Sequence, residues 1–68
     1  MSENASDQLI KFLEKKGDYY VELAKQHLHD NEPTKAKELL EGAISYYTKA
    51  GLKEKIEETR KKIEAIKK

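Results

Sequence analysis

The spacing of apolar side chains constrains this chain most, because one rhythm continues almost from end to end. Apolar or small residues recur at steps of three and four within residues 7–29, 33–50 and 52–67. That spacing puts them on one side of an α-helix, whereas a β-strand would need strict alternation, which the sequence lacks. The pattern therefore predicts an all-α protein with three helices at about residues 7–29, 33–50 and 52–67.

Two short segments separate these helices. The chain's single proline, Pro33, follows residues 30–32 and has no backbone N–H to donate, so it ends one helix and suits the first turn of the next. Gly51 stands where a left-handed residue commonly closes a helix. Because both links are short, consecutive helices must run antiparallel. The predicted architecture is an up-down-up three-helix bundle.

Two features near the start of the chain affect the helix boundaries. Ser6 or Asp7 is expected to cap the first helix, which leaves residues 1–6 as a disordered N-terminus and residues 7–68 as a single three-helix domain. Gly17 lies inside the first helical segment. The apolar pattern keeps its phase across this glycine, which favours one continuous helix, although the glycine could instead end one helix and let another begin.

Small residues are concentrated on the inner faces of the first two helices. Ala36, Ala43 and Ala50 follow one another at seven-residue steps, and Ala24 shares a face of the first helix with Gly17. Side chains this small let two helix axes approach to about 8 Å, the short end of the usual range. The pattern predicts a closely packed helical hairpin. The hairpin could serve stability alone or form a rigid platform on which a third element docks.

Part of this pattern resembles a known repeat. Across residues 17–50, bulky and small residues stand at the spacing of the tetratricopeptide repeat, at Tyr20, Leu23, Ala24, His27, Ala36, Leu40 and Ala43. The spacing is also similar to that of the microtubule-interacting and transport (MIT) domain, a three-helix bundle whose third helix would be residues 52–66. Members of that family dock amphipathic peptides beside the third helix. The resemblance implies a non-catalytic adaptor whose partners would be short helical tails of membrane-remodelling proteins.

The apolar surface is divided unequally among the three helices. At about 100° per residue, the apolar arc of the first helix is about 200° wide, twice that of an ordinary surface helix. The third helix offers an arc of about 80°, which is too narrow to cover both flanks of the first. One flank carries Phe12 and Tyr19, and the other carries Ile10 and Val21.

We therefore expect part of this surface to bind another protein. The predicted partner-binding residues are Ile10, Phe12, Tyr19, Val21, Ile56 and Ile63. The first hypothesis is a groove of the first and third helices that holds an amphipathic helical segment of a partner. An alternative is a self-complementary patch that makes a structural homodimer or seats the chain in a larger assembly. A folded-back N-terminus could also absorb the excess within the chain.

Residues that carry catalysis or metal binding are sparse. The chain has no cysteine and its three glycines are isolated, which excludes a thiolate metal site and a glycine-rich phosphate loop. His27 and His29 point to different faces of a helix and cannot easily hold one metal ion. The carboxylates are expected on solvated faces, which are poor positions for general acid catalysis. We expect no enzyme activity, no cofactor and no metal.

Charge is distributed unevenly along the chain, although the net charge is only +1. Residues 52–68 hold seven Lys or Arg against four Glu, which suggests a weaker alternative function. In this alternative, the protein is a nucleic-acid accessory protein that contacts phosphates through its basic third helix. The interleaved glutamates and the lack of aromatic residues in that segment argue against it.

The composition also bears on where the protein works. The polar N-terminus lacks the pattern of a secretory signal, and no apolar run approaches the roughly 20 residues of a membrane span. We therefore expect a soluble, cytoplasmic protein. Charged residues make up 40% of the chain, mostly Lys and Glu, which resembles the composition of thermophile proteins.

Overall fold

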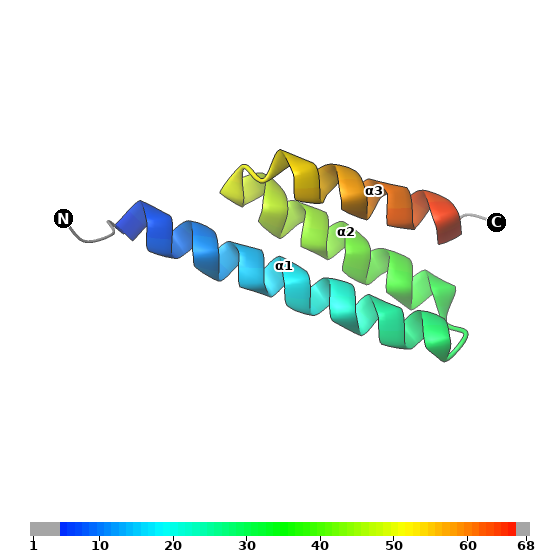
Figure 1. The fold of residues 1–68 in the computed structure, drawn as a ribbon. Helices are drawn as coiled ribbons and strands as arrows, with labels where there is room; N and C mark the ends of the chain where they lie inside the picture. Colours follow the sequence, from blue (N-terminus) through cyan, green and yellow to red (C-terminus); the bar gives the residue numbers. More distant parts are fainter. Residues whose placement is uncertain (1–4, 67–68) are drawn as a thin grey trace.

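The computed structural model describes residues 5–66, which form three α-helices joined by two short connections (Figure 1). The helices are α1 (Ala5–His29), α2 (Pro33–Ala50) and α3 (Lys53–Ile66). Consecutive helices run in opposite directions, and no strand occurs among residues 5–66. The predicted all-α class and the up-down-up three-helix bundle are confirmed.

Helix α1 begins earlier than the sequence predicted. It starts at Ala5, so Ser6 and Asp7 lie within its first turns instead of capping it. Ala5 and Ser6 are therefore helical, while the rest of the predicted disordered N-terminus, residues 1–4, lies outside the described residues. The helix continues for 25 residues through Gly17, so the alternative of two separate helices is wrong.

The connection from α1 to α2 turns on a left-handed residue. Asn31 has a φ of 63°, a conformation that asparagine tolerates better than most residues. The backbone N–H of Glu32 donates to the carbonyl oxygen of His27 at 2.8 Å, and the Glu32 carboxylate lies 2.6 Å from Nδ1 of the same histidine. Pro33 then occupies the first turn of α2, where no backbone N–H is required.

Gly51 ends α2 as predicted. Its φ of 73° is left-handed, and its N–H donates to the carbonyl oxygen of Thr48 at 3.1 Å. The N–H of Leu52 donates to the carbonyl oxygen of Tyr47 at 3.0 Å. This pair of hydrogen bonds satisfies the last carbonyl groups of α2 and reverses the chain within two residues, so that α3 begins at Lys53.

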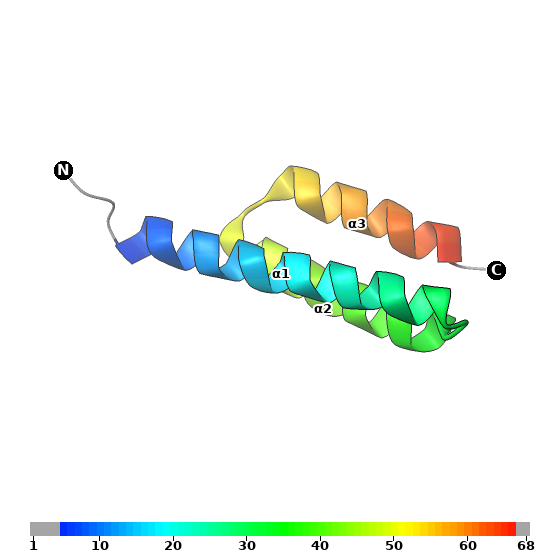
Figure 2. The same ribbon diagram turned by 60° about the horizontal axis from the view of Figure 1, so that its bottom comes forward.

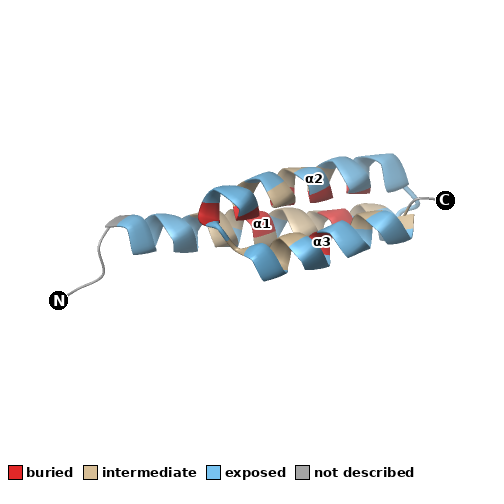
Figure 3. Cartoon of the chain, turned by 90° about the horizontal axis from the view of Figure 1, so that it is seen from above, coloured by how far each residue is buried: buried red, intermediate tan, exposed pale blue. Residues whose placement is uncertain are grey.

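Small residues hold α1 and α2 close together. Ala24 of α1 and Ala36 and Ala43 of α2 are buried, and Ala50 is buried at the end of the same row. Leu40 is the largest of the fully buried side chains among the described residues. The core is therefore a narrow seam along the inner face of α2, with exposed faces outside it (Figure 3).

The bundle is elongated and open along one side. Helix α2 packs against both other helices, whereas α1 and α3 approach each other closely at few points. Figure 2 shows the first turns of α1 extending beyond α2 and α3. The molecule measures 48 × 18 × 12 Å, and its radius of gyration of 13.1 Å exceeds the value of about 11 Å expected for a compact domain of this length.

Candidate functional site

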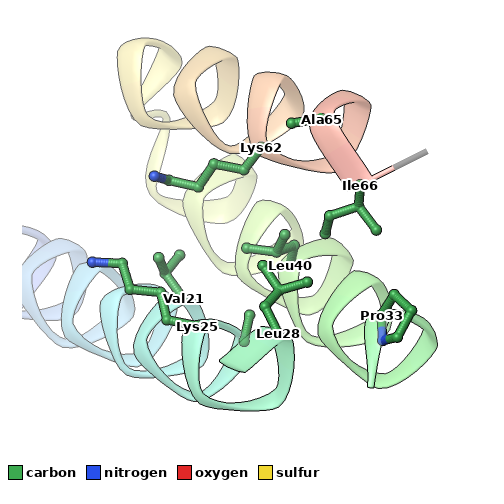
Figure 4. A pocket seen from close by; sticks show the side chains of 9 residues that line it. Val21, Lys25, Leu28, Pro33, Leu40, Lys62, Ala65 and Ile66 are labelled. Atoms are coloured by element: carbon green, nitrogen blue, oxygen red, sulfur yellow. The ribbon is translucent and has the colours of Figure 1, made fainter. Parts of the chain in front are cut away.

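A groove runs between α1 and α3, with α2 as its floor. Its apolar part has a volume of about 350 Å³ and lies near the C-terminal end of α3 (Figure 4). A second, more polar cavity of about 260 Å³ continues it and shares Val21 and Lys62 with it. The apolar side chains of the groove are Val21, Ala24, Leu28, Pro33, Leu40, Ala65 and Ile66.

The groove is open because α3 has few bulky side chains on the side that faces α1. In Figure 4, Val21 and Leu28 point from α1 toward α3, and Leu40 rises from the floor. From the opposite wall α3 offers the small Ala65, while Ile63 packs against the buried core. Leu28 consequently stays 41% exposed although it lies beside the buried core.

Two lysines stand at the rims of the apolar part. Lys25 comes from α1 and Lys62 from α3 (Figure 4). Nζ of Lys25 donates to Oε2 of Glu22 at 3.2 Å, but both side chains are exposed and such a pair contributes little to stability. Lys62 has no hydrogen bond or ion pair within residues 5–66. The rims therefore favour an occupant that carries negative charge beside its apolar residues.

A polar network joins all three helices at the other end of the groove. The Tyr47 hydroxyl of α2 donates to Oδ1 of Asp18 on α1 at 2.5 Å, and Nζ of Lys55 on α3 donates to the same oxygen at 3.0 Å. Lys55 also pairs with Oε2 of Glu14 at 3.0 Å, and its Nζ lies 5.6 Å from the centre of the Tyr47 ring. These contacts fix one end of α3 relative to α1 and leave the apolar end of the groove open.

The network shifts the pKa values of its members. Partial burial acts to raise the pKa of Asp18, but the hydrogen bonds from Tyr47 and Lys55 and the lysine charge outweigh it, so this pKa lies below its ordinary value. Burial, and then the hydrogen bond to Asp18, raises the pKa of Tyr47 far above normal. Hydrogen bonds to Asp18 and Glu14 raise the pKa of Lys55. None of the three is poised to exchange a proton near neutral pH, so the network suits structure rather than general acid–base catalysis.

A second apolar surface lies on the opposite flank of α1. Leu9, Phe12 and Tyr19 remain 56%, 56% and 60% exposed. Lys16 lies among them, with Nζ 5.8 Å from the ring centres of both Phe12 and Tyr46. At about 100° per residue, this surface lies about 150° around α1 from the apolar part of the groove. We call it the α1 stripe, and it consists of Leu9, Phe12, Lys16, Tyr19 and Leu23.

The residues of α1 that the sequence predicted to bind a partner fall on two surfaces. Val21 lines the groove. Phe12 and Tyr19 belong to the α1 stripe, on the other flank of the helix. Ile10 is 37% exposed and does not line the apolar groove. The wide apolar arc of α1 is therefore real, but it presents two separate faces rather than one site.

Helix α3 lines the apolar groove through residues other than those predicted. Ile56 and Ile63 are half-buried and are absent from its walls. The residues that α3 does contribute are Lys62, Ala65 and Ile66. Lys62 lies one helical turn before Ile66, and Ala65 precedes Ile66 directly, so the three residues lie on one side of α3. That shared side was the feature of the sequence that could have identified these groove residues.

The two histidines contact different carboxylates. Nδ1 of His27 lies 2.6 Å from Oε1 of Glu32, and Nδ1 of His29 lies 3.7 Å from Oδ1 of Asp30. Within residues 5–66, no group of three or more His, Cys, Asp or Glu side chains is placed to hold a metal ion.

One basic residue of α3, Lys55, already takes part in the polar network that joins the three helices. Lys55, among the phosphate contacts that the nucleic-acid alternative would need, is bound to Glu14 and Asp18. The neighbouring Thr59 is buried, and its hydroxyl donates to the carbonyl oxygen of Lys55 at 2.7 Å. Residues 67–68, which supply two further lysines, lie outside the described residues.

No protein-family model, no curated protein and no solved structure matches the chain. The resemblances to the tetratricopeptide repeat and the MIT domain therefore rest on residue spacing alone. The structure itself shows a small all-helical protein of three helices. Within residues 5–66, none of the helices combines the length and the apolar character needed to cross a membrane.

Proposed function

We propose that this protein is a non-catalytic interaction module that holds an amphipathic helical segment of another protein in the groove between α1 and α3. The observation that carries the proposal is the apolar groove of about 350 Å³, which no element within residues 5–66 fills. A helix laid along it would pack against both walls and the floor, and would bury Leu28, Ala65 and Ile66, which the single chain leaves partly or fully exposed.

The lining of the groove defines the chemistry of the partner. Its apolar walls suit a helix with apolar residues at steps of three and four. Lys25 and Lys62 on the two rims suit Glu or Asp residues beside that apolar face, which would set the orientation of the segment more than its affinity. The residue spacing that resembles the MIT domain supports the same proposal, because members of that family dock amphipathic peptides beside the third helix.

A designed peptide tests the proposal directly. The probe is a fluorescein-labelled peptide of about 15 residues, which spans about 22 Å as a helix and so matches the 14-residue α3. It carries leucines at steps of three and four with glutamates beside them, and its binding is measured by fluorescence anisotropy. The control peptide has the same composition in an order that breaks the apolar face. We expect saturable binding of the first peptide and none of the second.

Variants of the groove identify where the peptide binds. Ala65→Glu puts a carboxylate on the apolar wall and should weaken binding about tenfold or more, because a buried unpaired charge costs more than about 1.4 kcal/mol. Lys62→Glu should shift the preference toward a probe flanked by lysines in place of glutamates. The control is Lys37→Glu, which makes the same charge change at an exposed position of α2 that does not line the groove.

Either of two results would contradict the proposal. One is the absence of saturable binding to the probe. The other is equal binding by Ala65→Glu, Lys62→Glu and Lys37→Glu, because that would place the peptide elsewhere on the protein. All three positions are exposed, so the variants should keep the fold. Their circular dichroism spectra check this expectation.

A further inference from the structure

We propose that two copies of this chain associate through the α1 stripe as an antiparallel, two-fold symmetric homodimer. The stripe residues alternate steps of three and four along α1, and this heptad spacing keeps them in one line. They occupy an arc of about 80°. A narrow line of side chains like this has the shape of a coiled-coil interface. It therefore suits a single helix packed along α1 rather than a globular partner.

The aromatic side chains of the α1 stripe are exposed in the single chain and available for contact with another helix. Phe12 and Tyr19 expose more than half of their surface, and Tyr46 extends the face from α2. Tyr46 meets Tyr20 edge to face, with ring centres 5.2 Å apart. Lys16 lies over two of these aromatic rings, which positions its aliphatic stem within the seam. Aromatic side chains have only two side-chain torsions, so they lose little conformational freedom on association.

The length of α1 sets the register of the dimer. The helix runs from residue 5 to residue 29, so an antiparallel copy overlaps it almost completely when the two-fold axis passes between residues 17 and 18. In this register Phe12 lies opposite Leu23 of the second copy, and Lys16 lies opposite Tyr19 of the second copy. Each contact occurs twice, because a two-fold interface uses the same surface of both chains.

The charges beside the stripe identify a second copy as the occupant. Lys15 and Glu22 are both exposed and flank the stripe on the side away from α2. In the register above, Lys15 of each chain lies near Glu22 of the second copy, so two interchain ion pairs form. Within one chain these residues are two turns apart, about 10 Å along the helix, which is too far for them to pair. Glu22 also accepts from Lys25 at 3.2 Å, and a carboxylate has acceptor capacity for both lysines.

The dimer leaves the groove between α1 and α3 accessible. The α1 stripe and the apolar part of the groove lie about 150° apart around α1, so neither surface covers the other, although Glu22 beside the stripe also lines the polar cavity. The inference therefore does not depend on the proposed peptide binding, and either can fail without the other.

Sedimentation equilibrium over a concentration series measures the association. We expect the average mass of the wild type to rise from the 7.9 kDa of one chain toward twice that value between about 1 and about 500 µM, as mass action requires. The double variant Phe12→Ser/Tyr19→Ser should stay at the mass of one chain, because it removes the aromatic part of the seam. Both replaced side chains are mostly exposed in the single chain, so the variant should keep its helical circular dichroism.

Charge reversal tests the register itself. Lys15→Glu places like charges opposite Glu22 of the second copy, and Glu22→Lys does the same opposite Lys15, so each variant alone should dimerise about tenfold more weakly or worse. A mixture of the two restores opposite charges at both sites and should form a heterodimer. The double reversal Lys15→Glu/Glu22→Lys should regain association for the same reason. Lys37→Glu, with an equal change of net charge, should dimerise as the wild type does.

These measurements decide the inference. It is supported if the wild type dimerises, the single reversals weaken the dimer and the mixture restores it. A wild type that remains at 7.9 kDa throughout the series overturns it. So does a dimer that is insensitive to Lys15→Glu and Glu22→Lys, because the two chains would then meet through a different surface. Retained binding of the designed peptide by the Phe12→Ser/Tyr19→Ser variant would show that the groove functions separately.

Discussion

Replacing Gly17 with alanine sets two physical effects against each other. Alanine is the better helix former, and the change in a helix interior would stabilise the protein by about 1 kcal/mol if nothing else differed. At this position, however, α1 lies against the ring of Tyr47. A Cβ atom on residue 17 would stand 2.8 Å from Cδ1 and Cζ of that ring, well inside the 3.4–4 Å of ordinary contact.

The structure indicates that the unfavourable effect is larger. Tyr47 is 2% exposed and its hydroxyl is held by Asp18, so the ring cannot move aside freely. Overpacking of this kind costs about 1–3 kcal/mol. A displaced ring would also weaken a hydrogen bond to a charged group, which contributes about 1.5–3 kcal/mol. After the gain in helix propensity is subtracted, we expect Gly17→Ala to lower the free energy of unfolding by about 2 kcal/mol or more.

Thermal unfolding followed by circular dichroism measures this effect. For a domain of this size, about 2 kcal/mol corresponds to a fall in Tm of roughly 10 °C. The control is the same substitution in a Tyr47→Ala background, where the ring is gone and Gly17→Ala should stabilise by about 1 kcal/mol. The reversal of sign is the test. If Gly17→Ala also raised the Tm of the wild type, residue 17 could not lie as close to the Tyr47 ring as the structure shows.

Further predictions concern the helix end, the core and pH. Gly51→Ala should lower the free energy of unfolding by about 1 kcal/mol, because the φ of 73° is unfavourable for alanine although no atom lies within 4 Å; an unchanged urea midpoint would contradict this. Leu40→Ala should cost about 2–5 kcal/mol, and retention of a cooperative transition at the wild-type midpoint would argue against the narrow core. The pKa of Asp18 is lower in the folded chain than its ordinary value of 3.8, so its stabilising effect is complete above that pH and is lost as the pH falls further; Asp18→Asn should flatten this acid limb of the urea midpoint. The pKa values of Tyr47 and Lys55 are raised in the folded chain, so their stabilising effect is complete below about pH 10 and is lost as the pH rises. Tyr47→Phe should therefore make the fall of the urea midpoint at alkaline pH shallower. An unchanged slope would count against the network.

The helices could be predicted from the sequence because their determinants are local. Apolar steps of three and four, the proline at position 33 and the left-handed Gly51 each act within one or two turns. The row of buried alanines on α2 could also be predicted from the sequence, because residues seven apart lie on the same helix face. The start of α1 was missed because Ser6 and Asp7 are common capping residues, yet in this chain the helix continues past them to Ala5.

The groove could not be located from periodicity because it depends on where α3 lies around α2. That position is fixed by contacts distant in the sequence. Tyr47 and Asp18 are 29 residues apart, and Lys55 and Asp18 are 37 apart. Nothing in the residues next to Asp18 indicates this role, because both of its partners lie on other helices. The apolar width of α1 correctly indicated uncovered surface, but not that Ile56 and Ile63 would be absent from the apolar groove.

The α1 stripe stays uncovered because the helices differ in length and α3 lies on one side of α1. At 25 residues α1 is about 37 Å long, whereas the 14-residue α3 is about 21 Å long and lies on one flank only. A single short helix cannot cover a long one whose apolar arc extends to both flanks, so the α1 stripe stays uncovered even where α3 is docked. Pairing two α1 helices through the stripe would place the two grooves on opposite outer faces of the dimer, running in opposite directions. A partner with two amphipathic segments joined by a flexible linker could then occupy both, and its apparent affinity would exceed that of one segment by the effective concentration that the linker provides. Removing the stripe should abolish that gain while leaving the affinity for a single segment unchanged, because the two surfaces share a helix but no side chain.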